Sequence, residues 1–147
     1  MPYDNSQNTN KGRSFQVQAA EILSKHFNVL FQPDFAMKIG NPPKEHRFDL
    51  VSIDLRYVTE CKNYSWTESG NTPSAKITSI NESVFYLSFL SNKIIRFVTM
   101  RKDVHPRRKE TLAEYYYRTN SHLLGDIFII EVDLESKAII EIGRAVR

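Results

Sequence analysis

The sequence has very little cysteine and no long apolar run. Its single cysteine, Cys61, cannot form a disulfide within the chain. A lone cysteine also excludes a zinc site of the CxxC type. No apolar stretch approaches the roughly 20 residues that a membrane-spanning helix needs, and the polar N-terminus has no apolar signal core. We therefore expect no membrane partner and a location in the reducing cytoplasm.

Histidine is also scarce, and the rest of the composition is that of a globular protein. The histidines stand apart in the sequence, without the short spacings of a zinc site. Of the 147 residues, 41% are hydrophobic and 25% are charged, which favours one domain with one core. Residues 1–10 are polar and rich in asparagine, so we expect a flexible N-terminal tail there and a single domain over residues 11–147.

The first part of the chain alternates between helical and extended patterns. Residues 12–27 have the apolar spacing of an amphipathic helix. Residues 28–40 predict one strand, or a bent pair broken near Pro33, and residues 40–46 have the composition of a loop. The residues that share the inward face of the predicted helix are Phe15, Ala19, Ile22, Leu23 and His26.

The remaining segments complete an α/β pattern. A hairpin is predicted over residues 47–66, where β-branched and aromatic residues flank a short polar break. Next come a helix over 74–90, a strand over 93–102, a helix over 109–125 that ends near Gly125, and two strands within 126–143. The order α-β-β-β-α-β-α-β-β predicts a mixed β-sheet flanked by α-helices.

The predicted hairpin contains charged residues that an ordinary hairpin would not need. Side chains alternate between the two faces of a strand, so Glu60 and Lys62 share a face while Cys61 points the other way. A tight turn at Asp54–Leu55 would pair Val51 with Val58 and Asp49 with Glu60. Directly opposed residues lie on one face of the sheet. This register therefore brings Asp49, Glu60 and Lys62 together.

Two opposed carboxylates destabilise a sheet unless a cation lies between them. Lys62 is one candidate for that cation, as a plain ion-pair partner. A hard divalent cation such as Mg²⁺ is the other, because it binds one or two carboxylates and keeps several waters. In that case a lysine beside the metal can orient a water and stabilise charge on a phosphate. The residues alone leave both explanations open.

The spacing of these residues resembles the active-site motif of the PD-(D/E)xK nuclease superfamily, which has the restriction-endonuclease-like fold. The similarity covers about residues 12–100. It includes Asp49, the Glu60-Cys61-Lys62 triplet at the end of the second hairpin strand, and the preceding amphipathic helix. The order of a helix, three strands, a helix and a strand is also similar to the core of that fold.

The resemblance implies Mg²⁺- or Mn²⁺-dependent hydrolysis of DNA phosphodiester bonds. Asp49 and Glu60 would bind the metal, together with the backbone carbonyl of Cys61, and Lys62 would position the attacking water. The 3′ oxygen would be the leaving group. A restriction-type or junction-resolving endonuclease is the expected activity. Because a chain of this length has no separate recognition domain, we expect a homodimer or a component of a larger complex.

The sequence departs from the family pattern at two positions. Phe48 precedes Asp49, where the motif has proline, and the literal Pro33-Asp34 pair lies one strand too early to pair with Glu60. Many members also have a glutamate on the first helix, where the Gly12-xxx-Gln16 spacing gives a glutamine. We expect Gln16 to hold a metal-bound water, and its missing charge weakens the case for a second metal.

A run of basic residues predicts either contact with the phosphate backbone of DNA or a solvated charged loop. Lys93, Arg96, Arg101, Lys102, Arg107, Arg108 and Lys109 occur with Asp103 as the only acid. Tyr115, Tyr116 and Tyr117 cannot share one helical face, although some of them could join Arg118 in an aromatic and basic patch. Trp66 is expected either to stack on a base or to cap the core. The expected DNA contacts are Lys76, Arg101, Lys102, Arg107, Arg108, Lys109 and Trp66.

Two other functions compete with the nuclease. The same fold could serve as a non-catalytic nucleic-acid-binding module, with the acids in a structural cluster of ion pairs. An interaction domain without nucleic acid would leave the basic run without a role, and it predicts no salt-dependent DNA binding. The sequence does not indicate the preferred DNA structure, endonuclease or exonuclease action, or the number of metals.

Overall fold

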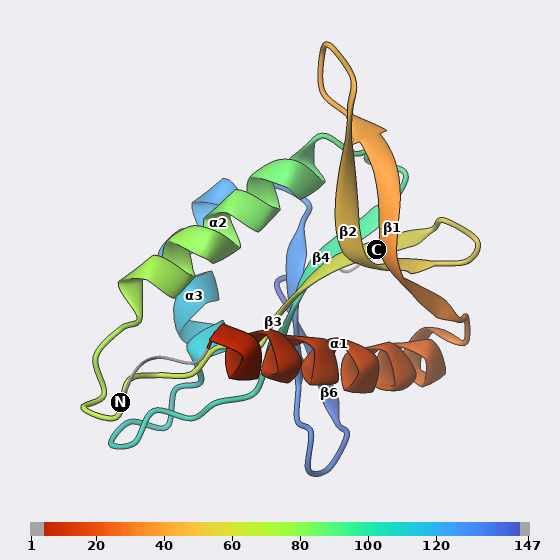
Figure 1. The fold of residues 1–147 in the computed structure, drawn as a ribbon. Coiled ribbons are helices and arrows are strands. Elements are labelled where there is room, and N and C mark those ends of the chain that lie inside the picture. The colour runs from red at the N-terminus through yellow and green to blue at the C-terminus, as the bar shows by residue number, and fades with distance from the viewer. Residues whose placement is uncertain (1–4, 145–147) are drawn as a thin grey trace.

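A computed structural model of the chain describes residues 5–144, which form a mixed sheet with helices on both faces (Figure 1). The predicted order of helices and strands is confirmed, with one added 3₁₀ turn, η1. In chain order the elements are α1 (Asn5–Phe27), β1 (Phe31–Ile39), β2 (Lys44–Ser52), β3 (Tyr57–Lys62), α2 (Ser74–Ser88), β4 (Ile95–Arg101), α3 (Leu112–Asn120), η1 (Ser121–Leu123), β5 (Phe128–Val132) and β6 (Ile139–Ile142).

The six strands form one sheet in the order β1-β2-β3-β4-β5-β6. β1, β2 and β3 are antiparallel neighbours, β3, β4 and β5 run parallel, and β6 returns antiparallel to β5. Both parallel connections contain a helix, α2 or α3, as parallel crossovers require. The carboxyl ends of β3, β4 and β5 therefore lie at one edge of the sheet.

Helices cover the two faces of the sheet and bury separate apolar clusters (Figure 1). α1 lies on one face, where Phe15, Ala19 and Leu23 pack against strand residues such as Leu50. α2 and α3 lie on the other face over Val58. In the described range 5–144, no helix is long and apolar enough to cross a membrane.

The inward face predicted for α1 is confirmed except at its C-terminal end. Phe15, Ala19, Ile22 and Leu23 are buried. His26 is exposed instead, and its Nε2 lies 3.1 Å from Glu141 Oε1 at the margin of the sheet. α1 also begins at Asn5, so residues 5–10 of the expected tail are helical, and residues 1–4 lie outside the described range.

The first hairpin is longer than predicted. The turn between β1 and β2 occupies residues 40–43, and Lys44–His46, which were expected in a loop, belong to β2. His46 pairs with Met37 and Lys44 with Ile39. The hairpin extends beyond the rest of the sheet (Figure 1).

The connection between β2 and β3 is wider than the predicted two-residue turn. It spans residues 53–56, with Leu55 at φ 61°. The Ser52 hydroxyl accepts hydrogen bonds from the peptide N–H groups of Arg56 and Tyr57, at 3.1 and 2.9 Å, and donates one to Asp54. Val51 nevertheless pairs with Val58 and Leu50 with Thr59, so the predicted register is confirmed.

Candidate active site

β2 and β3 separate at the position of the two carboxylates. Their pairing covers only Leu50–Thr59 and Val51–Val58, whereas β3 continues alongside β4 as far as Lys62. At the point of separation the Asp49 N–H donates to Glu60 Oε2 at 3.3 Å, and the Cys61 N–H donates to Asp49 Oδ2 at 2.7 Å. Each carboxylate thus accepts a peptide N–H from the opposite strand, and the two acids meet.

Glu60 is the buried member of this pair, with 5% of its surface exposed. Burial, followed by the negative charge of Asp49, raises the pKa of Glu60 to about 9, against a smaller opposing effect of Lys62. The carboxyl of Glu60 therefore retains its proton at neutral pH unless a cation compensates the charge of the pair.

His46 adds a third polar group on the face of the sheet that α2 covers. Its Nε2 lies 2.9 Å from Glu60 Oε1, and its ring stacks on Tyr86 of α2 with centroids 3.9 Å apart and planes 12° apart. Burial lowers the pKa of His46, against the opposing charges of Asp49 and Glu82. Tyr86 was missed in the sequence because it was one of several apolar residues on a predicted helix.

Lys62 lies on the same strand and face as Glu60, as alternation predicts, but it does not form an ion pair with either acid. Its Nζ instead donates to Ser79 Oγ of α2 at 3.2 Å. The Tyr64 hydroxyl donates to the same serine oxygen at 2.9 Å. The plain ion-pair explanation of Lys62 is therefore wrong for this arrangement.

Gln16 joins α1 to both strands of the first hairpin. Its Nε2 donates to the Asp49 carbonyl oxygen at 2.7 Å and to Asp34 Oδ1 at 3.2 Å. Asp34 has φ 51° and lies opposite Asp49 in the register, between the pairs Pro33–Leu50 and Phe35–Phe48. The Pro33-Asp34 pair thus lies beside the site, on β1, although the sequence interpretation set it aside. Only the amide oxygen of Gln16 is left to accept from a water.

Cys61 points away from the acids, as predicted. Its side chain packs with the apolar cluster under α1, and burial raises the pKa of its thiol. A reactive thiolate is therefore disfavoured. The residue can contribute to the site only through its backbone, between Glu60 and Lys62.

The oxygen atoms at this point fit a hard divalent cation. Mg²⁺ prefers oxygen ligands, typically one or two carboxylates with several waters. Asp49 and Glu60 provide two carboxylates, and the Cys61 carbonyl lies between Glu60 and Lys62 along β3. Over the described part of the chain, no three side chains of His, Cys, Asp or Glu converge as a metal-binding group. Two carboxylates and one carbonyl would leave the other ligand positions of such a cation to water.

Exchange of Gln16 for a carboxylate tests whether its amide replaces a charge at this site. We expect Gln16→Glu to lower the free energy of unfolding by about 1–3 kcal/mol in EDTA, because the Asp49 carbonyl loses its donor and Asp34 gains a like charge. Added Mn²⁺ is expected to restore part of this loss. Thermal unfolding with and without Mn²⁺ measures both effects, and Gln18→Glu on the exposed face of α1 is the control. Equal melting temperatures of Gln16→Glu and wild type in EDTA would contradict this assignment.

The predicted basic run is divided between the two ends of β4. Lys93 and Arg96 lie at its start, and Arg96 is 5% exposed and forms an ion pair with Asp126. These two residues therefore do not belong to a DNA-facing surface with the others. The basic residues beyond Met100 lie at the carboxyl end of β4, beside the end of β3 and Lys62.

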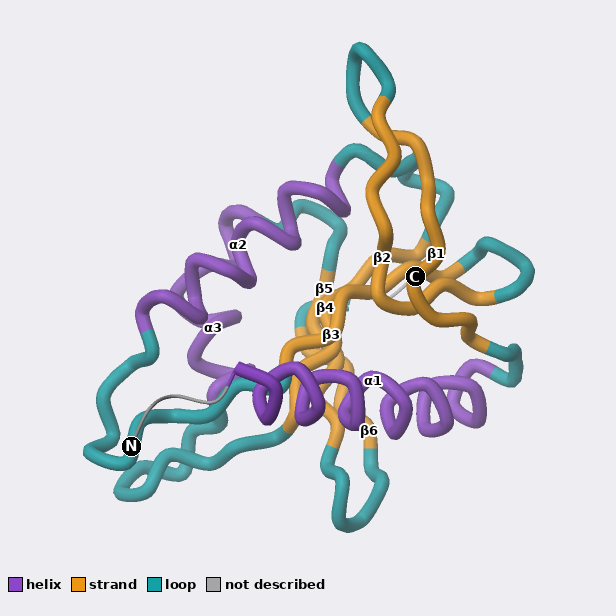
Figure 2. Tube along the Cα trace, in the orientation of Figure 1, coloured by secondary structure: helices purple, strands orange, loops and turns teal. Residues whose placement is uncertain are grey.

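Two loops join at this end, residues 63–73 after β3 and residues 102–111 after β4 (Figure 2). The Trp66 N–H donates to Asp103 Oδ2 at 2.8 Å, and the indole N–H donates to the Asp103 carbonyl at 3.1 Å. With 6% of its surface exposed, Trp66 belongs to the core. The alternative of base stacking is therefore wrong for this residue.

Histidine and arginine side chains complete the contact between the two loops. His105 Nδ1 accepts the N–H groups of Arg107 and Arg108, both at 3.0 Å, while its Nε2 lies 2.8 Å from the Gly70 carbonyl oxygen. The Arg107 guanidinium donates to the Ser69 carbonyl at 2.7 Å. A ring that accepts at Nδ1 and donates at Nε2 is a neutral imidazole.

The basic side chains predicted to contact DNA differ in their solvent exposure and in their bonds to other residues. Arg101 donates to Asn63 Oδ1 at 2.6 Å and to Ser65, and Lys102 lies 4.0 Å from Asp133. Arg101 therefore orders the first loop. The predicted contacts that remain exposed are Lys76, Lys102, Arg107, Arg108 and Lys109, with Arg108 also over the Trp66 ring.

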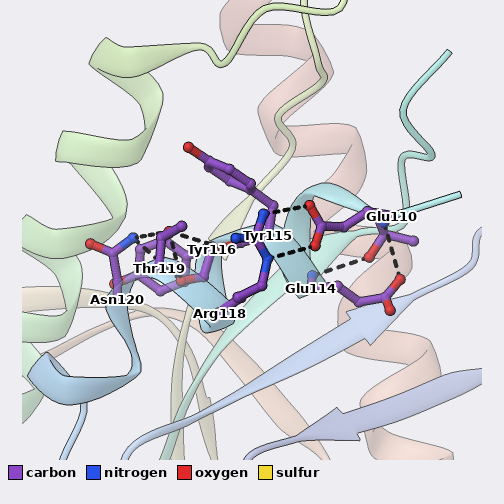
Figure 3. Close-up of polar contacts among 8 residues, drawn as sticks. Glu110, Glu114, Tyr115, Tyr116, Arg118, Thr119 and Asn120 are labelled. Carbon is purple, nitrogen blue, oxygen red and sulfur yellow. Dashed lines mark hydrogen bonds and ion pairs between the residues drawn. The ribbon is translucent and has the colours of Figure 1, made fainter. Parts of the chain in front are cut away.

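The aromatic and basic patch expected on α3 is limited to Arg118 and Tyr115 (Figure 3). Tyr116 is buried, and its hydroxyl donates to Asn81 at 2.6 Å. The Arg118 guanidinium makes two hydrogen bonds to the Glu110 carboxylate, at 2.9 and 3.0 Å, and lies over the ring of Tyr115. The charge of Arg118 is thus already paired within the protein.

In comparisons with protein-family models, curated proteins and solved structures, nothing matches this chain. A proposal for its function therefore depends on the geometry and chemistry of the site.

Proposed function

We propose that this protein is a metal-dependent deoxyribonuclease with the restriction-endonuclease-like topology, acting as an endonuclease on phosphodiester bonds. The main support is the meeting of Asp49 and Glu60 at the separation of β2 and β3, with Lys62 on the same face. The parallel β3–β4 pair joined by α2 agrees with the topology that the motif implies.

Asp49, Glu60 and the Cys61 carbonyl would hold Mg²⁺ or Mn²⁺. Such a cation, when bound, lowers the pKa of a coordinated water and stabilises negative charge on phosphate oxygens. His46 would fix the orientation of the Glu60 carboxylate through Oε1, in the way that outer hydrogen bonds orient metal ligands. Gln16 would keep α1 and the Asp49 backbone in place.

Lys62 would bind the attacking water and the reacting phosphate as a hydrogen-bond donor. During hydrolysis a water oxygen forms a bond to phosphorus while the bond to the 3′ oxygen breaks, and the leaving oxygen gains a proton. The exposed basic residues Arg107, Arg108 and Lys109, at the same edge of the sheet, would contact the DNA backbone. A single site cuts one strand, so a duplex cut would require a second copy or a partner protein.

Removal of metal tests this function directly. We expect the protein to cut plasmid, single-stranded or branched DNA in Mg²⁺ or Mn²⁺, and to cut none of them when EDTA replaces the metal. Electrophoresis of the three DNAs after incubation measures the products. An Asp49→Asn variant is the matched control for contaminating nucleases. Cleavage that survives EDTA, or that the variant retains, would sink the proposal.

A second candidate is a non-catalytic nucleic-acid-binding module. The observation that favours it is that both carboxylates already have hydrogen-bond partners within the protein, namely peptide N–H groups and His46. Lys62 likewise already donates a hydrogen bond to Ser79. This alternative predicts DNA binding that weakens with salt and no cleavage in any divalent metal. The same incubations, with a binding assay added, distinguish the two functions.

A further inference from the structure

Four side chains beside the carboxylate pair form a cluster that the motif does not explain. Tyr64 follows β3, and two ammonium groups lie near its ring, with Lys76 Nζ 4.8 Å and Lys62 Nζ 5.8 Å from the ring centroid. Ser79 accepts hydrogen bonds from both Lys62 and Tyr64. Because Lys76 and Ser79 are three residues apart on α2, they lie on one face of that helix.

We propose that Lys62, Lys76 and the Ser79 hydroxyl form an anion site for one phosphate group of a nucleic-acid strand, with Tyr64 as its wall. This inference rests on the proposed function, since the site would hold a phosphate next to the carboxylate pair. Lys62 and Glu60 are two residues apart on one face of β3, so their Cα atoms are about 7 Å apart along the strand and the phosphate would lie next to the acids.

The charges of the cluster favour an anion. Among the residues that the structure describes, neither Lys62 nor Lys76 forms an ion pair with a carboxylate. Two ammonium groups near one ring repel each other, and an anion that binds both of them offsets this electrostatic repulsion. Lysine is a common phosphate ligand that acts as a point charge. The ring of Tyr64 stabilises each ammonium group through cation–π contact without neutralising its charge.

The hydroxyl of Ser79 provides a third donor of a different kind. Its oxygen already accepts from Lys62 and from Tyr64, at 3.2 and 2.9 Å. Its hydrogen is therefore left to donate, and within residues 5–144 no acceptor for it occurs. A phosphate group offers several acceptor oxygens to one hydroxyl and two ammonium groups. A carboxylate ligand has only two oxygens, so the donor set fits a phosphate better.

Binding measured in EDTA tests the site without cleavage. We expect Lys76→Gln to raise the Kd of a labelled single-stranded oligonucleotide about fivefold in 0.1 M salt, and to reduce the slope of log K against log salt by about 0.7. Ser79→Ala is expected to raise the Kd about threefold. Lys93→Gln, an exposed lysine at the other end of β4, is the matched control and should bind like wild type. Wild-type affinity and slope in Lys76→Gln would overturn the proposal.

Titration with inorganic phosphate tests the same residues without nucleic acid. We expect the side-chain ammonium signals of Lys62 and Lys76 to shift together in ¹⁵N NMR spectra, and to shift less in Ser79→Ala. Phosphate that perturbs neither signal would refute the site, and phosphate binding with unchanged oligonucleotide affinity in Lys76→Gln would refute its assignment to a strand. Phosphate and oligonucleotide binding without cleavage in Mg²⁺ would support this site while refuting only the nuclease.

Discussion

A Lys62→Ala variant should fold normally and cut DNA at least about a hundredfold more slowly than wild type in Mg²⁺. The loss is expected because Lys62 lies on the same face of β3 as Glu60 and its charge acts on that carboxyl. Its only side-chain hydrogen bond within the described residues is to Ser79, so its removal leaves no buried charge without a partner. Single-turnover cleavage with enzyme in excess separates this effect from weaker DNA binding.

Two further variants make the test of Lys62 specific. Lys62→Arg keeps the charge but changes the shape and reach of the donor, and it should remain strongly impaired if a point donor is required. Lys93→Ala removes an exposed lysine at the far end of β4 and should cleave like wild type. Suppose that Lys62→Ala and wild type cleave DNA at equal rates and that EDTA stops both reactions. This result would exclude Lys62 from the reaction.

Glu60→Gln is expected to have opposite effects on cleavage and on stability. Loss of a metal-binding carboxylate should reduce Mg²⁺-dependent cleavage at least about a hundredfold. In EDTA the same change removes a carboxyl that must take up a proton when the protein folds at pH 8, so the free energy of unfolding should rise by about 2 kcal/mol at that pH. The amide can still accept the Asp49 N–H and donate to His46, so it keeps the contacts that Glu60 makes.

The stability of the wild type in EDTA should depend on pH for the same reason. Burial and the charge of Asp49 raise the pKa of Glu60 to about 9 in the folded protein, whereas a glutamate in an unfolded chain titrates near about 4.3. The folded state therefore holds the proton over a range in which the unfolded state has lost it. The resulting stabilisation is complete below the unfolded pKa and is lost as the pH rises through the folded pKa.

Urea unfolding from pH 5 to 9 in EDTA measures this dependence. The wild type should lose stability as the pH rises, and Glu60→Gln should lose less over the same range. Glu135→Gln, an exposed acid after β5, is the control and should follow the wild type. Parallel curves for wild type and Glu60→Gln would show that Glu60 is not desolvated as described.

The register of the β2–β3 hairpin was predictable from the centre of its turn. A turn centred on Asp54–Leu55 places Val51 opposite Val58, and the positions of Asp49, Glu60 and Lys62 followed from it. The connection is wider than predicted but keeps the same centre, since residues 53–56 lie symmetrically about Asp54–Leu55. The inward face of α1 was predictable from its apolar spacing, and the prediction was wrong for His26 because that residue lies at the margin of the sheet.

Other features depend on contacts that no local pattern encodes. Lys44–His46 are polar because their end of the hairpin extends beyond the core, so the strand has no apolar alternation there. Asp34 reaches the site through the pairing of β1 with β2. Lys93 and Arg101 are close in the sequence, but the strand between them, with a rise of about 3.3 Å per residue, places them about 20 Å apart. Adjacency in the sequence therefore grouped Lys93 and Arg96 with basic residues that lie at the other end of β4.

The contacts between the loops after β3 and β4 affect the entropy of association. Trp66, Asp103, His105 and Arg107 fix the backbone that presents the exposed arginines. A strand that binds there need not order a mobile segment first, and each loop or side chain that must be ordered on binding reduces the affinity. This edge of the sheet should therefore bind a nucleic-acid strand more tightly than a flexible basic tail of equal charge would.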